Sequence, residues 1–81
     1  MRIEHHPEAY LELIEASSFY EQRSEGLGEA LIEAVEAAVL RIRDDPLLFP
    51  VTYRDRRRCP VNRFPYSVFY RLIGDTIRVL G

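Results

Sequence analysis

The sequence predicts a single α+β domain with the element order β-α-α-β-β-β, in which a helical hairpin packs on one side of a mainly antiparallel sheet. Two observations support this fold class. The first half of the chain repeats apolar residues with helical spacing, and the second half alternates apolar with polar residues as strands do. A third is length, because 81 residues suffice for one small core and therefore for one domain, covering 1–81.

The first three elements follow from short local patterns. RIEHH alternates and is the predicted first strand, and Pro7 suits the first turn of a following helix. Within PEAYLELIEASSFYEQR the apolar side chains share one stripe and the glutamates lie largely off it, so an amphipathic helix is expected. The two glycines of SEGLG then interrupt the pattern, which is typical of a tight connection between antiparallel helices.

The second helix is predicted to begin at Leu27 and to end at Asp45, since a residue before proline resists helical geometry. Glutamates lie near its start and arginines near its end, as the helix dipole favours. The helical and strand periods together predict a set of core contacts between this helix and the sheet. These involve Leu31, Val35, Val39 and Ile42 on the helix and Val68, Tyr70 and Leu72 on the sheet.

The remaining chain reads as a loop and three strands. LLFPVTYRD is predicted to be a loop with apolar anchors. RRRCPVN is a predicted strand with Cys59 and Val61 facing the core and Arg56 and Arg58 facing outward. Because Pro60 has no N–H for a ladder, this strand is expected at a sheet edge or bulged. YSVFYRLI and TIRVLG are the last two strands, joined by a two-residue Gly-Asp turn.

Several classes of protein are excluded or disfavoured by composition. The single cysteine, Cys59, allows no internal disulfide and fits a reducing cytoplasm, where we expect the protein to act. There is no signal peptide and no stretch of membrane-spanning length. The neighbouring His5 and His6 would point to opposite faces of a strand, so no metal site is predicted, and no cofactor is implied.

Positive charge is concentrated in the second half of the chain. The net charge is −2, and all eleven basic residues are arginines. Residues 1–45 carry a net charge of −7, whereas residues 46–81 carry +5. Arginine is preferred over lysine where planar, multidentate contacts with phosphate or carboxylate are made. The distribution therefore predicts an anionic partner for the second half of the chain.

Tyrosines are interleaved with these arginines, and together they are the candidate site residues. Such a surface could grip phosphates while stacking bases, or receive an acidic peptide, and the residues alone leave both open. Metal-free RNA cleavage needs a base and an acid. The second half has neither histidine nor lysine, which leaves tyrosine or arginine to move protons. The candidate residues are Arg56, Arg57, Arg58, Arg63, Tyr66, Tyr70, Arg71 and Arg78.

Motifs along the whole chain resemble the RelE/ParE toxins of bacterial type II toxin–antitoxin modules. They are YEQR, GLGEALIEAVEAAVLRI, DPLLFP, RR, RFPYSVFYR and DTIRVL. The most specific is the group RFPY at Arg63, followed by Tyr70 and Arg71. The resemblance implies the fold predicted above, a toxic activity, and a cognate ParD-like antitoxin that wraps the toxin in a hetero-oligomer and masks that activity.

Two activities occur in that family, and the resemblance favours one of them. The RelE branch cuts messenger RNA on the ribosome, and the ParE branch poisons DNA gyrase. The nuclease branch carries an arginine where this chain has Ser67, and lysines where it has Arg58 and Pro60. The Arg-Phe-Pro-Tyr form is more similar to the ParE branch, which implies a gyrase inhibitor that is not itself an enzyme.

Two further expectations concern the end of the chain and the role of the arginines. Family members usually continue past the last strand with a basic segment that contributes to activity, whereas this sequence ends at RVLG. A non-toxic remnant that only binds antitoxin therefore stays open beside the gyrase poison and the ribosome-dependent endoribonuclease. We expect Arg56 and Arg58 chiefly to bind an acidic C-terminal segment of the antitoxin, added along an exposed edge strand.

Overall fold

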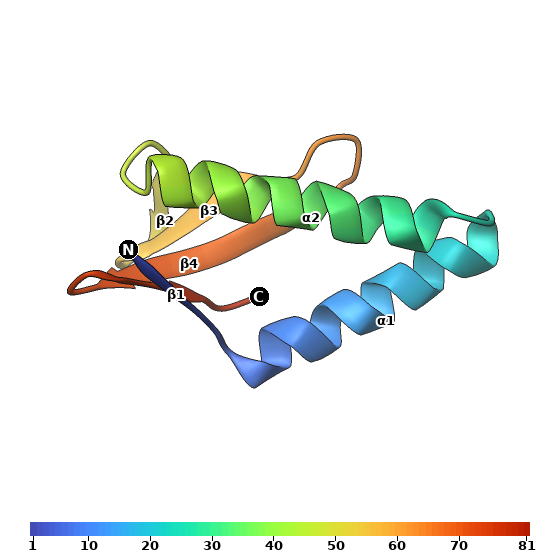
Figure 1. The fold of residues 1–81 in the computed structure, drawn as a ribbon, viewed down its shortest axis with the longest axis horizontal. Coiled ribbons are helices and arrows are strands. Elements are labelled where there is room, and N and C mark those ends of the chain that lie inside the picture. The colour runs from blue at the N-terminus through green and yellow to red at the C-terminus, as the bar shows by residue number, and fades with distance from the viewer.

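Two helices and five strands make up the protein in a computed structural model that describes all residues, 1–81 (Figure 1). A helical hairpin lies on one side of a single sheet with the strand order β1-β5-β4-β3-β2. The α+β prediction and the helical hairpin are confirmed. The elements are β1 (Arg2–His5), α1 (Pro7–Arg23), α2 (Leu27–Asp44), β2 (Val51–Tyr53), β3 (Arg56–Pro60), β4 (Ser67–Ile73) and β5 (Thr76–Val79).

The sheet is antiparallel except at one edge. Strands β2 to β5 pair with their sequence neighbours in antiparallel fashion, and Ile73 faces Thr76 across the predicted two-residue turn. Strand β1 instead runs parallel to β5, with Arg2 opposite Thr76. The first and last strands of the chain are therefore neighbours, and a mainly antiparallel sheet is confirmed.

The loop prediction for LLFPVTYRD is wrong at Val51–Tyr53, which form strand β2 against the start of β3. All three residues of β2 are exposed, so the alternation of burial that marks a strand is missing from the sequence. Leu47 and Leu48 do not anchor the segment, because both are exposed; Phe49 alone of these apolar residues packs against the core.

Strand β3 is not an edge strand as a whole, although β2 pairs only with Arg56 and Arg57, so Pro60 has a neighbouring strand on one side alone. Strand β2 lies beside its first residues, and the N–H of Arg58 donates to the carbonyl of Pro50 at 3.1 Å. Beyond that point the guanidinium of Arg41 donates to the carbonyl of Pro60 at 3.0 Å. The side of β3 that faces away from β4 is thus already occupied by groups of this chain, so it offers no free ladder for an added strand.

The connection between the helices is held by the carboxylate of Glu21 and by the close packing of Gly28 against the backbone of α1. The carboxylate of Glu21 accepts hydrogen bonds from the backbone N–H groups of Gly26 (3.0 Å) and Gly28 (2.9 Å), and these bonds lower its pKa. Gly26 has a left-handed φ of 85°, which glycine adopts without strain. A Cβ on Gly28 would lie 2.5 Å from the carbonyl oxygen of Ser17, so only glycine allows the helices to approach this closely.

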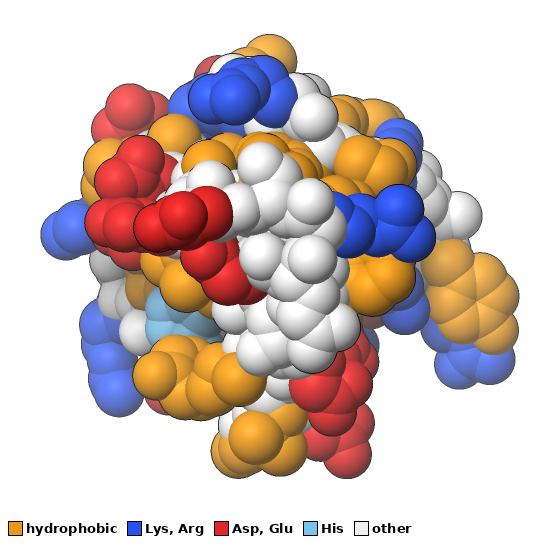
Figure 2. Space-filling model, turned by 90° about the vertical axis from the view of Figure 1, so that its right-hand side faces the viewer, with side chains coloured by type: hydrophobic (Ala, Val, Ile, Leu, Met, Phe, Trp, Pro, Cys, Tyr) orange, Lys and Arg blue, Asp and Glu red, His pale blue; other side chains and the backbone are white.

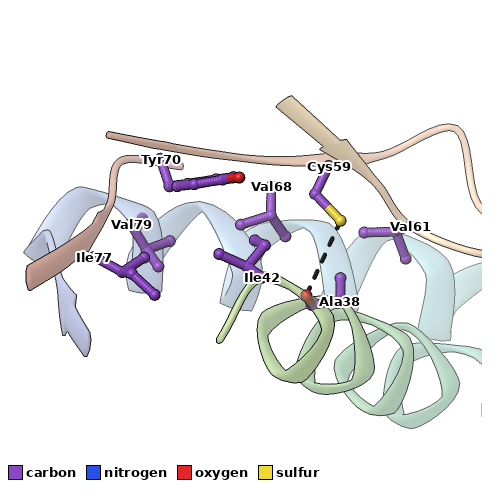
Figure 3. Close-up of a cluster of buried hydrophobic side chains, with 9 residues drawn as sticks. Ala38, Ile42, Cys59, Val61, Val68, Tyr70, Ile77 and Val79 are labelled. Carbon is purple, nitrogen blue, oxygen red and sulfur yellow. Dashed lines mark hydrogen bonds between the residues drawn. The ribbon is translucent and has the colours of Figure 1, made fainter. Parts of the chain in front are cut away.

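The core lies between α2 and the sheet (Figure 3). Cys59, Val68 and Tyr70 project from the sheet toward Ala38 and Ile42 of α2, and the Cys59 thiol faces the carbonyl of Ala38. Burial raises the pKa of that thiol, which makes it an inert core residue.

Part of the predicted set of core contacts is wrong. Ile42 is buried in the core cluster as predicted, and Val35 is half-buried and packs against it. Leu31 is buried outside that cluster, Val39 is only half-buried, and Ala38 lies in the cluster instead. The cause is that α1 diverges from α2 and reaches the core only through Ala9 (Figure 1). Val35 and Val39 then line an open apolar groove of about 620 Å³ between the helices and the sheet. Neither helix is sufficiently long and apolar to span a membrane.

Candidate partner-binding surface

The face of the sheet opposite the helices carries most of the clustered arginines. Alternation along β3 and β4 turns Cys59 and Val68 toward the core, and therefore turns Arg58 and its cross-strand partner Phe69 outward. Arg71 lies directly opposite Arg78 on the same outward face. We call this surface the arginine face; it consists of Arg56, Arg58, Phe69, Arg71 and Arg78.

The arginine face has few charges that balance it. The guanidinium of Arg71 binds the carboxylate of Asp55 with two hydrogen bonds, of 2.7 and 3.2 Å, and these lower the pKa of Asp55. Arg58 and Arg78 make no side-chain hydrogen bond or ion pair within the chain. Like charges directly across a strand pair repel each other, so the Arg71–Arg78 pair favours an anion from outside.

The first arginine of β3 lies against an aromatic ring. The guanidinium of Arg56 lies over the ring of Phe69, 4.0 Å from its centroid. Phe69 is therefore covered on its outer side, and the arginine is oriented along the sheet. Alternation with the buried Val68 and Tyr70 identifies Phe69 as an outward residue, but an uncharged ring gives no sequence signal that it belongs to a cationic surface.

Two of the predicted site residues lie away from this surface. Arg57 points to the core side and donates to the carbonyls of Leu47 (3.3 Å) and Phe49 (2.7 Å). Tyr70 is completely buried, and its hydroxyl donates to the carbonyl of Pro46 at 2.6 Å. Burial raises the pKa of Tyr70. Both residues hold the segment between α2 and β2 and are not free to contact a partner.

The other two predicted residues lie between β3 and β4. Arg63 is exposed and has a left-handed φ of 73°, and it belongs to the loop before the arginine face. Tyr66 is half-buried, and its pKa is raised by burial and by the nearby carboxylate of Glu12. Tyr66 thus borders the surface without standing among the arginines.

A cavity of about 350 Å³ adjoins the arginine face. Arg56 and Phe69 belong to both, so the cavity opens beside the guanidinium that covers the ring. Pro65, Tyr66 and Leu80 supply its other apolar surface. Ser67 lines it too, and the small side chain of Ser67 leaves the space open. Sequence reasoning missed this cavity because its walls come from segments far apart in the chain: α1 through Glu12, the strands β3 and β4, the loop before β4, and the chain after β5.

Most acidic residues lie on the helical side of the molecule. Figure 2 views the end that carries the α1–α2 turn, where acidic and apolar side chains gather and arginines lie at the margins. Both helices are rich in glutamate, and their glutamates are exposed. The protein therefore has a glutamate-rich helical side and an arginine-rich sheet side, in agreement with the charge division along the chain.

The chemistry available on the arginine face is binding by cations. The two histidines lie elsewhere: His5 lines the groove between the helices and the sheet, and His6 caps α1 by accepting the N–H of Glu8 at 3.1 Å. No group of three or more His, Cys, Asp or Glu side chains is gathered for a metal ion. The face can therefore hold carboxylates or phosphates and offers no obvious group to transfer a proton.

Comparison with known proteins identifies the family. The family described as "ParE toxin of type II toxin-antitoxin system, parDE" matches residues 3–81. A solved structure described as the chromosomal ParDE TA system from P. aeruginosa superposes with a TM-score of 0.70 at 20% identity, covering 99% of this chain and 90% of that chain. No curated protein matches in sequence. The resemblance to the ParE branch is thus confirmed: the chain belongs to the ParE toxin family and is the toxin of a type II toxin–antitoxin system, with an antitoxin as its partner.

Proposed function

We propose that this toxin acts in the cytoplasm by binding DNA gyrase and blocking its activity, without cleaving RNA. The observation that supports this function best is the composition of the arginine face. Its cations are gathered on one surface, and no histidine or lysine stands among them. The nearby carboxylates are those of Asp55, which Arg71 binds, and of Glu12, which lines the adjoining cavity with Arg56. Binding to a protein target needs only such a surface, whereas catalysis needs more.

The nuclease alternative lacks a histidine or lysine on the arginine face to act as base or acid. Arginine stays protonated at any physiological pH and cannot act as a general base. The hydroxyls of Tyr66 and Tyr70 have raised pKa values, so even less of either residue is present at neutral pH as the phenolate that could act as a base. The hydroxyl of Tyr70 is buried as well. Efficient proton transfer requires a pKa near the working pH. The residues present therefore support target binding over RNA cleavage.

A supercoiling assay tests the proposal directly. Purified gyrase and relaxed plasmid are incubated with increasing toxin, and supercoiling is followed on agarose gels. We expect inhibition that rises with toxin concentration and is cancelled by prior addition of the antitoxin. The matched negative control is toxin carrying Ile42→Asp, which should not fold because it places an unpaired charge at a fully buried position.

The other two functions give different results. Unchanged supercoiling together with new, codon-aligned 5′ ends in primer extension on a translated message would show a ribosome-dependent nuclease instead. A chain that binds its antitoxin but inhibits neither gyrase nor translation would be a non-toxic binding protein. Growth arrest on induction of the wild-type gene, relieved by co-expression of the antitoxin, would exclude that last outcome.

A further inference from the structure

We propose that the apolar groove between the helices and the sheet binds a second copy of this chain, through an antiparallel, two-fold contact between the two α2 helices. The groove has a volume of about 620 Å³ and lies where α1 diverges from α2 (Figure 1). Val68 and Val79 line it from the core side of the sheet, so it is separate from the arginine face. The inference holds whether or not gyrase is the target.

One wall of the groove is a continuous stripe along α2. Its members recur every three or four residues and therefore lie on one face of the helix. They are Ile32, Val35, Glu36, Val39, Leu40 and Arg43. This stripe lies beside the one that packs on the sheet through Ala38 and Ile42. Helix α2 thus has two largely apolar faces, and only the face on the sheet is fully buried.

Apolar side chains at the mouth of the groove are left in contact with solvent. Leu40 is 58% exposed and Tyr10, from α1, is 64% exposed, although both line the groove. Val35 and Val39 beside them are only half-buried. Eleven of the fifteen lining residues are hydrophobic. A concave apolar surface of this kind is typical of an interaction site, so an apolar partner is expected to cover it.

The other lining residues indicate which partner fits. They are His5, Gly81 and the two charged residues of the stripe, Glu36 and Arg43. Both charged residues are exposed, and neither has an ion pair within the chain. On α2 neither has an opposite charge three or four residues away, where helical ion pairs form. A partner that presents one base and one acid with the same spacing, beside apolar side chains, satisfies both.

A second copy of the chain presents this arrangement. Glu36 and Arg43 are two helical turns apart, or about 10.5 Å along α2. If two α2 helices lie antiparallel with the two-fold axis between Val39 and Leu40, Glu36 of each copy is opposite Arg43 of the other. The axis then passes beside the exposed leucine, so Leu40 of each copy packs against Val39 of the other and enters its groove. A parallel arrangement would instead place Glu36 opposite Glu36.

The apolar contact and the charges have different roles in this dimer. Removal of two exposed Leu40 side chains from water supplies most of the affinity. Exposed ion pairs contribute little free energy each, but they select the orientation and register, because other registers leave the charges unpaired or place like charges together. The net charge of −2 per copy is small, so general repulsion between the two copies is weak.

Sedimentation equilibrium of the purified free toxin tests the apolar contact. We expect a reversible dimer with Kd on the order of 10 μM, as befits a small interface. Leu40→Glu should raise Kd at least about 50-fold, because it places a charge at the centre of the contact. The matched control is Leu48→Glu, which replaces another exposed leucine, 66% exposed and outside the groove, and should change Kd by less than about threefold. Melting temperatures establish that both variants are folded.

A charge exchange tests the antiparallel register. Glu36→Arg and Arg43→Glu, made separately, each turn both symmetric ion pairs into like-charge contacts and should raise Kd about tenfold. The double variant Glu36→Arg/Arg43→Glu exchanges the charges in both copies and should restore Kd to within about threefold of wild type. The single variants change the net charge in opposite directions, so a loss common to both does not arise from net charge.

Three results would overturn the inference. Wild-type toxin that stays monomeric at about 200 μM would show that the groove does not bind a second copy. If Leu40→Glu then weakened antitoxin binding about tenfold or more in calorimetry, the groove would belong to the antitoxin instead. A dimer that is unaffected by Leu40→Glu, or weakened equally by Leu48→Glu, would not be held by the groove. A double variant as weak as the single ones would exclude the antiparallel pairing of Glu36 with Arg43.

Discussion

The guanidinium of Arg57 donates a hydrogen bond of 2.7 Å to the backbone carbonyl of Phe49. It also reaches the carbonyl of Leu47 at 3.3 Å, and so ties strand β3 to the segment that follows α2. The middle arginine of the RRR run is thus part of the framework, while its two neighbours point to the opposite face. The three arginines should respond differently to substitution.

Arg57→Ala is expected to lower the free energy of unfolding by about 1–3 kcal/mol, because two carbonyls lose a charged donor. Arg58→Ala should change it by less than about 0.5 kcal/mol, since that side chain is exposed and has no partner. Urea denaturation followed by circular dichroism measures both. Equal effects of the two substitutions would contradict the structural role of Arg57.

Tyr70→Phe is expected to cost about 1–2 kcal/mol, because it leaves the carbonyl of Pro46 without its donor. The same hydroxyl predicts a pH dependence. Its pKa is raised in the folded state, so the stabilising effect is complete below the unfolded pKa of about 10 and is lost as pH rises through the folded pKa. Denaturation between pH 8 and pH 11 should therefore show a steeper loss of stability in wild type than in Tyr70→Phe.

Gly28→Ala should destabilise the helical hairpin by about 1–3 kcal/mol, because its Cβ would lie 2.5 Å from the backbone oxygen of Ser17. Gly26→Ala is the matched comparison: its Cβ meets nothing within 4 Å, and the cost of about 1 kcal/mol comes only from the left-handed φ. Melting temperatures measured by thermal denaturation show which of the two substitutions destabilises the protein more. A larger loss in Gly26→Ala would mean that the helices separate easily at this joint.

Glu21→Gln is expected to destabilise the protein at neutral pH and to have little effect in acid. The pKa of Glu21 is lowered in the folded state by the N–H groups of Gly26 and Gly28. Its stabilising effect is therefore present above the ordinary pKa and disappears as pH falls through the lower, folded value. Stability curves of the two proteins from pH 7 downward should converge. Parallel curves would show that the charge of Glu21 contributes nothing.

Local patterns predicted the helices well, because proline and glycine determine both ends of each one. Pro7 opens α1, Gly26 precedes α2, and Pro46 lies just after the end of α2. Strand β2 could not be predicted in the same way. It has three residues, all exposed, and is a strand only because β3 lies beside it. Strand β2 forms because it pairs with β3, and its exposed residues show no hydrophobic periodicity from which a strand could be predicted.

The same alternation rule explains the successes and failures at the candidate site. It predicted that Arg56 and Arg58 face outward, and their exposure confirms it. It also directs Tyr70 inward beside Val68, so counting Tyr70 among the surface residues conflicted with the predicted core. The role of Arg57 could not be predicted from the sequence of β3 alone. Its hydrogen-bond partners are backbone carbonyls, which every residue has, so the sequence does not indicate which ones it binds.

The parallel pairing of β1 with β5 affects when the folded toxin first exists in the cell. Arg2 pairs with Thr76, so β1 has no neighbouring strand until β5 has been synthesised. The helical hairpin is local and can form early, whereas the arginine face is assembled from β3, β4 and β5, which emerge late. At roughly 5–20 residues per second, translation of the second half of the chain takes several seconds. During that time the nascent chain carries the glutamate-rich helices without the completed sheet, and a partner that recognises the arginine face finds its binding surface only after β5 has emerged.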